Sequence, residues 1–471
     1  MAEKQWDGNP KTACFIFPEA SGHINSSLAL SQRLSKKGWN VHYLSALVMK
    51  ECIENTGATF DDERDAAPDL CKGGLGYFAA YERLKEEKCP GEKSWKGRAH
   101  LENLFLLMKL PGTIEWLQSK KPSVVVYCPI WNRIGQVSAK VLGIPHVAIV
   151  TIAGLGGFPT ILKGFLEPEG ATFEDYKCLY DSSDCNQAAI DSLCSEPYNL
   201  DRSLFEEGTP LYYFGTKPPF ARTLGKHTIV TTISSLRDPL CDSLEEEDKL
   251  YLENGGSKLH YIGPMLGGEN MTRAATHKAA FTEDERKLLI EQSERAHRRR
   301  SELHPKQGED IVGLVKNAKS KGRRIVLQPD ALDDIILPPN SIARASVAQV
   351  DILRSMDSTD LFVHHGGQNS TMEGGSCGIP MVVCPTFSDQ PVNAAKLVRL
   401  RVAVAIARPK NTSGPLAVKN YRAEVASAVS SIIEQQDKFA AAALKLKKEI
   451  SQGGGEEAAE AIILQAIEDG V

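Results

Sequence analysis

The chain lacks the features that define several classes of protein. Its first twelve residues are polar and contain no apolar core of a signal peptide. No apolar stretch reaches the ~18 residues that a transmembrane helix needs. The eleven cysteines are scattered and include no CxxC pair, which favours free thiols in a reducing compartment. We therefore expect a cytoplasmic protein without a transmembrane segment.

The chain also lacks an excess of positive charge. It has 55 basic and 60 acidic residues, for a formal net charge of −5, so nucleic acid is not an expected partner. Residues 281–304 contain the run Arg298–Arg300, but the acids around it favour a solvated helix face. With 471 residues, the chain is too long for one core, and two domains are expected.

Short apolar runs typical of buried strands alternate with helical patterns. The expected strands are residues 13–17, 41–45, 123–127, 146–151, 228–233 and 259–262 in the first half, and 324–327, 360–364, 381–384 and 402–407 in the second. The expected helices include 25–36, 135–142, 281–304, 311–318, 367–376, 390–400 and a tail from Ala423 that is interrupted at 453–455. This alternation predicts an α/β protein with doubly wound parallel sheets. The acidic segment 234–257 is a plausible domain linker.

Most of the recognisable chemistry lies in residues 361–393. A strand is expected to end at His364–His365, and the two glycines that follow allow a tight turn and close approach to a ligand. Residues 368–371 are types that begin a helix, and a helix N-terminus binds phosphate. Glu373 follows one turn later on the face of Asn369, where a carboxylate suits the hydroxyls of a ribose.

The next strand delivers Asp389 and Gln390, a carboxylate and an amide that suit the hydroxyls of a sugar. His364 and His365 would point to opposite sides of their strand, which argues against a shared metal ion. A Rossmann dehydrogenase is disfavoured because no GxGxxG follows the first strand.

These motifs resemble the donor-binding signature of the family 1 UDP-glycosyltransferases. The family pattern HxGxNSxxE is matched by His365–Glu373, GxPxxxxP by Gly378–Pro385 and DQxxNA by Asp389–Ala394. Weaker resemblances to the family's GHxNP, YxGP and PQxxIL motifs occur at Ser21–Asn25, Tyr261–Pro264 and Gln349–Leu353.

The resemblance implies a GT-B fold, in which two Rossmann-like domains face a cleft and the last helix returns to the N-terminal domain. The boundaries expected here are 1–245 for the acceptor-binding domain, 246–265 for a linker, 266–430 for the nucleotide-sugar domain and 431–471 for the returning helical segment.

The resemblance also implies an inverting transfer of a sugar, most simply glucose from UDP-glucose. The UDP-sugar would be a co-substrate, with no other cofactor and no metal, and the acceptor would be a hydrophobic small molecule. His23 would be the catalytic base, and the acceptor walls would come from 78–81, 104–110 and 152–165. The donor-binding residues implied by the motifs are His365, Gly367, Gln368, Asn369, Ser370, Glu373, Asp389, Gln390 and Gln349.

Several positions depart from the family pattern. Cys128 stands where the family has the aspartate that orients the base, with Asn132 as a nearby polar substitute. Ser346 replaces the aromatic residue expected to stack on uracil, and Ala348 replaces a proline. No strand that begins a second sheet is recognisable between Gly268 and Arg323. These departures support an alternative, a GT-B scaffold that binds a nucleotide or a lipophilic ligand without turnover.

Overall fold

The computed structural model describes residues 11–72, 76–206, 221–268, 271, 273–274, 325–327, 341–343, 348–386, 388–409 and 414–470. The chain divides into two compact units. The first comprises Met1–Ala274 together with Gln452–Val471, and the second comprises Ala275–Ser451.

The first unit is built on a seven-stranded sheet with the order β3-β2-β1-β4-β5-β6-β7, in which all pairs are parallel. The strands are β1 (Thr12–Ile16), β2 (Asn40–Ser45), β3 (Thr59–Asp62), β4 (Val124–Tyr127), β5 (His146–Val150), β6 (His227–Val230) and β7 (Lys258–Tyr261). The strand order reverses between β1 and β4. In such sheets, ligands bind outside the carboxyl ends of the strands at this point.

Alternate residues of the strands supply two separate hydrophobic layers, as the two-residue period of a strand requires. Cys14, Val125 and Tyr127 face one layer, while Phe15, Val124 and Val126 face the other. Both faces of the central strands are therefore covered, which explains their continuous apolar sequences.

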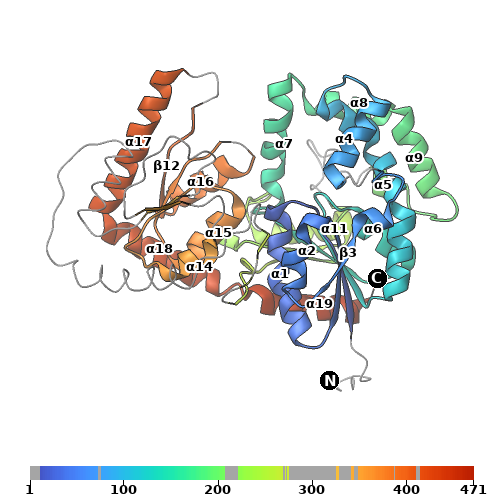
Figure 1. The fold of residues 1–471 in the computed structure, drawn as a ribbon, viewed down its shortest axis with the longest axis horizontal. Helices are drawn as coiled ribbons and strands as arrows, with labels where there is room; N and C mark the ends of the chain where they lie inside the picture. Colours follow the sequence, from blue (N-terminus) through green and yellow to red (C-terminus); the bar gives the residue numbers. More distant parts are fainter. Residues whose placement is uncertain are drawn as a thin grey trace. The chain divides into compact units, whose positions relative to one another are not determined.

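Helices cover both faces of this sheet (Figure 1). They are α1 (Ser21–Lys36), α2 (Lys50–Glu54), α3 (Glu63–Ala66), α4 (Tyr77–Lys88), α5 (Ser94–Lys120), α6 (Ile134–Leu142), α7 (Phe158–Leu166), α8 (Phe173–Ser182), α9 (Asp184–Cys194), α10 (Ser203–Glu206), α11 (Leu244–Gly255) and α19 (Gly455–Asp469). Single 3₁₀ turns occur at Leu47–Met49, Leu155–Gly157, Glu167–Glu169 and Ser234–Leu236. Helices α4, α5, α8 and α9 gather together beside the sheet.

The predicted linker at 246–265 is wrong, because this segment is part of the first unit. It contains most of α11 and all of β7, which pairs with β6 as the edge of the sheet. The run of acids reflects the start of a helix: Ser243 and Glu246 form a capping box at the N-terminus of α11. Acidic residues are favourable in a first helical turn because they face the positive end of the helix dipole.

The second unit contains a parallel sheet with the order β10-β11-β12. Its strands are β10 (Phe362–His364), β11 (Met381–Val383) and β12 (Ala403–Ala405), and a separate parallel pair joins β8 (Ile325–Leu327) to β9 (Ser341–Ala343). The helices are α14 (Gln349–Ser355), α15 (Gln368–Cys377), α16 (Gln390–Arg399), α17 (Pro415–Glu434) and α18 (Gln436–Ser451). Several predictions lie outside the described residues. They are the helices at 281–304 and 311–318, the lack of a strand between Gly268 and Arg323, and Ser346 in place of the aromatic residue.

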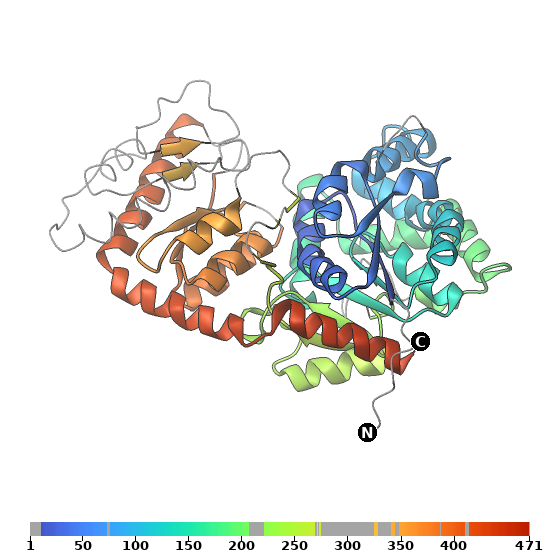
Figure 2. The same cartoon turned by 60° about the horizontal axis from the view of Figure 1, so that its bottom comes forward.

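The returning C-terminal helix is confirmed, although the predicted segment 431–471 is divided between the units. Helix α18 packs on α15 in the second unit, while α19 packs on α1 and the sheet of the first unit (Figure 2). Helix α18 is separated from α19 at Gly453–Gly455, where Gly454 and Gly455 have positive φ angles of 87° and 50°. In α19, Glu460 binds Arg33 Nε at 2.6 Å and Lys37 Nζ at 2.6 Å. Among the helices that the structure describes, none is both long enough and apolar enough to cross a membrane.

Candidate functional site

The first candidate site surrounds His23, at the switch point of the first sheet. His23 lies in the first turn of α1, directly after β1, because the helix begins at Ser21 rather than at the predicted Asn25. Cys128 follows β4, the neighbour of β1, and Thr151 follows β5. Three strands that are neighbours in the sheet, β1, β4 and β5, thus bring His23, Cys128 and Thr151 to its carboxyl edge.

Both ring nitrogens of His23 have hydrogen-bond partners. Nδ1 lies 2.7 Å from Thr151 Oγ1 and 3.2 Å from Cys128 Sγ. On the other side of the ring, the indole N–H of Trp131 donates to Nε2 over 2.9 Å. The register that placed Cys128 opposite His23 is therefore confirmed, whereas Thr151 and Trp131 carry no motif that would have identified them.

These contacts determine which nitrogen of His23 carries the proton. An indole N–H can only donate, so Nε2 must offer its lone pair. The proton of the neutral imidazole consequently lies on Nδ1, from where it donates to Thr151 or Cys128. The same tautomer is selected by the aspartate of a catalytic triad, which accepts from the corresponding nitrogen.

No carboxylate is bonded to His23 among the described residues. Burial lowers the pKa of His23 to about 4, so the ring is neutral at pH 7. Burial likewise raises the pKa of Cys128 to about 12, while the amides of Trp131 and Ile130 act in the opposite direction. Asn132, the predicted polar substitute, is buried, and its Oδ1 has no hydrogen-bond partner in the part of the chain that the structure describes. The thiol is neutral and cannot stabilise a charged imidazolium.

The second candidate site is the turn between β10 and α15, in the second unit. Gly366 has a φ of 92°, and a Cβ there would lie 2.8 Å from Val383 Cγ1, so both conformation and space require glycine. A Cβ on Gly367 would lie 2.5 Å from His365 Nε2, which places that imidazole against the start of α15. His365 is exposed and His364 is buried, so the adjacent rings lie on different sides of the strand end.

Asp389 closes one side of this helix start. Its Oδ2 accepts from the backbone N–H of Gln368 at 3.0 Å and from Asn393 Nδ2 at 2.8 Å. Helix α15 has Gly367 at its N-cap and no capping side chain of its own, so Asp389 supplies the cap from the loop after β11. Gln390 is also occupied locally, since its Oε1 accepts from the N–H of Thr386 at 2.9 Å.

Three further predicted residues meet on the next turn of α15. Gln349, the first residue of α14, donates to Ser370 Oγ at 3.0 Å and to Glu373 Oε2 at 2.6 Å. Glu373 is buried, and this bond holds its carboxylate in place. Asn369 is half-buried in the first turn of the same helix. All nine predicted donor residues therefore lie on α14, on the β10–α15 turn, on α15 or at the start of α16.

The charges at this site are close together. Burial lowers the pKa of His365, and the Asp389 carboxylate opposes that effect. Burial raises the pKa of Asp389, against hydrogen bonds from Gln368 and Asn393 and the charge of His365. The site thus combines first-turn amides of a helix, an imidazole and two carboxylates, groups suited to phosphate and to hydroxyls.

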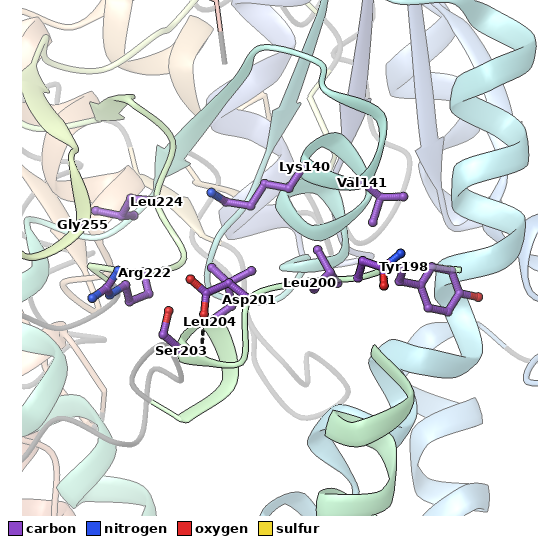
Figure 3. Close-up of a pocket in the computed structure, with 11 residues that line it drawn as sticks. Lys140, Val141, Tyr198, Leu200, Asp201, Ser203, Leu204, Arg222, Leu224 and Gly255 are labelled. Atoms are coloured by element: carbon purple, nitrogen blue, oxygen red, sulfur yellow. Dashed lines mark hydrogen bonds between the residues drawn. The ribbon is translucent and has the colours of Figure 1, made fainter. Parts of the chain in front are cut away.

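The predicted acceptor walls form mainly core in the first unit. The members of the principal cluster from these segments are Leu106, Leu110, Leu155, Phe158 and Leu162. Phe165 differs, since it is 53% exposed. A cavity of about 330 Å³ in this unit is lined by residues that include Lys140, Asp201 and Arg222 (Figure 3). Helix α6 carries Lys140 back to the start of β5, so this cavity lies towards the amino edge of the sheet, away from His23.

Comparisons with known proteins agree with this arrangement. Residues 324–437 match the family model described as UDP-glucoronosyl and UDP-glucosyl transferase. The chain is 34% identical over 137 residues to the NDP-glycosyltransferase YjiC of Bacillus subtilis, a stretch that covers 29% of this chain and 31% of that protein. The chain therefore spans less than a third of the length of the first curated relatives it matches. It is 26% identical over 407 residues to the uncharacterized UDP-glucosyltransferase YdhE of the same organism, covering 84% and 86% of the two chains.

Solved structures show the same fold over nearly the whole chain. The glycotransferase of kitacinnamycin has a TM-score of 0.58 at 20% identity, over 98% of this chain and 100% of that one. The calicheamicin glycosyltransferase CalG4 has a TM-score of 0.60 at 14% identity, over 98% and 99%. The protein thus has a GT-B fold. The comparisons also confirm the resemblance seen in the sequence, since residues 324–437 match the UDP-glycosyltransferase family model and the chain is similar to curated glycosyltransferases.

Proposed function

We propose that this protein is a glycosyltransferase that moves a sugar from a UDP-sugar to a hydroxyl group of a small molecule. The observation that carries the proposal is the β10–α15 turn. There, a Gly-Gly pair brings the backbone to a helix N-terminus, with His365 in front of it and the fixed carboxylate of Glu373 one turn behind. A diphosphate suits the helix N-terminus and His365, and a ribose suits the carboxylate of Glu373.

In the proposed reaction, the acceptor oxygen attacks the anomeric carbon of the sugar, and the bond from that carbon to the diphosphate oxygen breaks. UDP leaves with the bonding electrons, and the amides of α15 together with His365 stabilise its charge. His23 takes the acceptor proton on Nε2, because Nδ1 already carries a proton in the tautomer that the Trp131 N–H selects. Attack from the face opposite the leaving group inverts the anomeric configuration.

The finer assignments rest on residue chemistry. Glucose is the proposed sugar, since Asp389 and Gln390 offer a carboxylate and an amide for its hydroxyls. A hydrophobic acceptor suits the apolar segments 78–81, 104–110 and 152–165 of the first unit. We further propose that no divalent metal is needed, because amides and an imidazole would meet the phosphate charge. EDTA should leave the rate unchanged, and restoration of a lost rate by Mg²⁺ would contradict this assignment.

A binding scaffold without turnover is the second candidate. It is favoured by the surroundings of His23, where a buried neutral thiol stands beside Nδ1 and an indole covers Nε2. Hydrolysis of UDP-glucose by the purified protein, or transfer from it to a phenol, separates the two functions. A scaffold would bind UDP and consume no donor.

Calorimetric titration with UDP tests the donor site directly. His365→Ala and Glu373→Ala should each weaken binding by about 1–3 kcal/mol, the usual effect of losing a charge-assisted hydrogen bond. Glu424→Ala is a matched control, since this glutamate is exposed on α17, away from the turn. Unchanged UDP affinity in both site variants would refute the donor site.

A further inference from the structure

Trp131 occupies the catalytic side of His23. It belongs to a turn after β4 in which the N–H of Asn132 donates to the carbonyl of Cys128 at 2.8 Å. The turn directs the indole towards the start of α1, where its N–H meets His23 Nε2 at 2.9 Å. The two rings are nearly perpendicular, at 87°, with centroids 6.1 Å apart. The Arg98 guanidinium lies 4.5 Å from the indole centroid, a cation–π distance.

The position of the indole conflicts with the role of the base. The neutral imidazole has one free lone pair, on Nε2, and that lone pair already accepts the indole N–H. An acceptor hydroxyl that gives its proton to His23 must approach the same lone pair. The two donors therefore cannot occupy it together.

We propose that Trp131 is a positioning residue that holds His23 in its reactive tautomer and closes its acceptor side, and that the acceptor hydroxyl replaces the indole N–H on Nε2. This inference rests on the proposed function. Before the acceptor arrives, the indole keeps the proton on Nδ1, the task that a carboxylate performs elsewhere. The incoming O–H then donates to the same lone pair, so the tautomer is kept during the exchange.

The exchange favours a particular class of acceptor. A hydroxyl must compete with an indole N–H that is held by Arg98 across its ring face. Phenols are more acidic than aliphatic alcohols and are stronger donors, so they displace the indole more readily. We therefore assign phenolic acceptors to this site. Of the titratable or charged groups in the described residues, the Cys128 thiol lies beside Nδ1 and the Arg98 guanidinium lies behind the indole.

The test is ¹⁵N NMR of histidine-labelled protein without donor, comparing wild type with Trp131→Phe. In the wild type, His23 should show one tautomer, with Nε2 unprotonated. In Trp131→Phe, both tautomers should be populated, and the pKa of His23 should rise by about one pH unit because a donor to the neutral form is lost. Trp116→Phe is the control, since that indole lies elsewhere, on α5, and contacts Asp61 rather than His23. It should leave the spectrum of His23 unchanged.

A folded Trp131→Phe protein with an unchanged tautomer and an unchanged titration of His23 would overturn the inference. If Trp131→Phe fails to fold, Arg98→Leu takes its place in the test. The indole N–H of Trp131 should then exchange with solvent faster than in the wild type, and an equal exchange rate would also overturn the inference. Adding 4-nitrophenol and UDP to the wild type should release the indole N–H, and continued protection would refute the exchange. Because UDP binding is measured separately, failure of the donor site is distinguishable from failure of this contact.

Discussion

Replacing Cys128 by aspartate should accelerate transfer to aliphatic hydroxyls. The thiol lies 3.2 Å from His23 Nδ1, so a carboxylate at this position would accept the Nδ1 proton directly. The site already offers further donors to a carboxylate, since the amides of Ile130 and Trp131 point at the side chain of residue 128. A buried carboxylate with several donors is tolerated far better than an unpaired one.

The size of the gain follows from the stabilisation of the imidazolium. Burial lowers the pKa of His23 to about 4, and a neighbouring carboxylate raises such a pKa by about 1–3 units. That shift corresponds to about 1.4–4 kcal/mol in favour of the protonated ring. If about half of the proton transfer is complete in the transition state, the rate rises by ~3–30-fold. The effect of tautomer selection is small here, because Trp131 already holds the reactive form.

The assay measures initial rates with UDP-glucose and two acceptors, an aliphatic alcohol and a phenol. Cys128→Asn is the matched control, since its amide can accept from Nδ1 without adding charge, and it should stay close to the wild-type rate. The gain should be larger for the alcohol than for the phenol, which needs less help from a base. It should also vanish when His23→Ala is combined with Cys128→Asp. A folded Cys128→Asp protein with no gain on the alcohol would refute the reasoning.

The remaining predictions concern the cap of α15, the contacts of α19 and the effect of acidic pH on His23. Asp389→Ala should lower the free energy of unfolding by about 1–3 kcal/mol, because it removes the cap of α15 and the hydrogen bond from Asn393. Asp389→Asn keeps an accepting oxygen and should lower it by less. Denaturant titration measures both variants. Glu460→Ala should destabilise the protein by about 1–3 kcal/mol through the loss of its bonds to Arg33 and Lys37, while Glu457→Ala, at a 74% exposed side chain, should change stability by less than about 0.5 kcal/mol. Because the pKa of His23 is lowered to about 4 in the folded state, its neutral form stabilises the fold above pH ~6.5, and this contribution is lost as the pH falls towards and below 4. The acid limb of kcat/KM should accordingly lie near pH 4, and a limb near 6.5 would show that the base is not desolvated.

The apolar runs predicted most of the fold because buried parallel strands have a distinctive composition. The first sheet contains every strand expected there, and β10, β11 and β12 begin and end within about two residues of the expected positions. Strand β3, with the sequence TFDD, was missed because it is an edge strand that is only half-buried and has no apolar run. The acids of α11 were misread as a linker because a capping box and a solvated linker share the same residue types.

Most residues of the candidate donor site could be placed relative to one another because they follow one another along a single strand, turn and helix. Local spacing alone places His365, Gly367 and Glu373 relative to one another. Sequence could not reveal that Asp389 caps α15 or that Gln349 holds Glu373, since those bonds join elements separated by 21 and 24 residues. Trp131 was unpredictable for a different reason, because its role depends on the direction in which a turn sends one side chain.

The two sites differ in how their polar groups are satisfied. Glu373 and Asp389 are held by neighbouring amides, so the second unit presents a preorganised set of groups to a ligand. His23 is held by neutral partners alone, a hydroxyl and a thiol at Nδ1 and an indole N–H at Nε2. The indole N–H favours the uncharged ring because it donates to the lone pair that a proton would take, and burial acts in the same sense. A base in such surroundings accepts a proton readily only from a hydroxyl that is already acidic. The replacement of the family's aspartate by Cys128 and the indole at Nε2 therefore both make His23 a weaker base. Both restrict the proposed transfer to phenol-like acceptors, and neither alters the chemistry of the donor site.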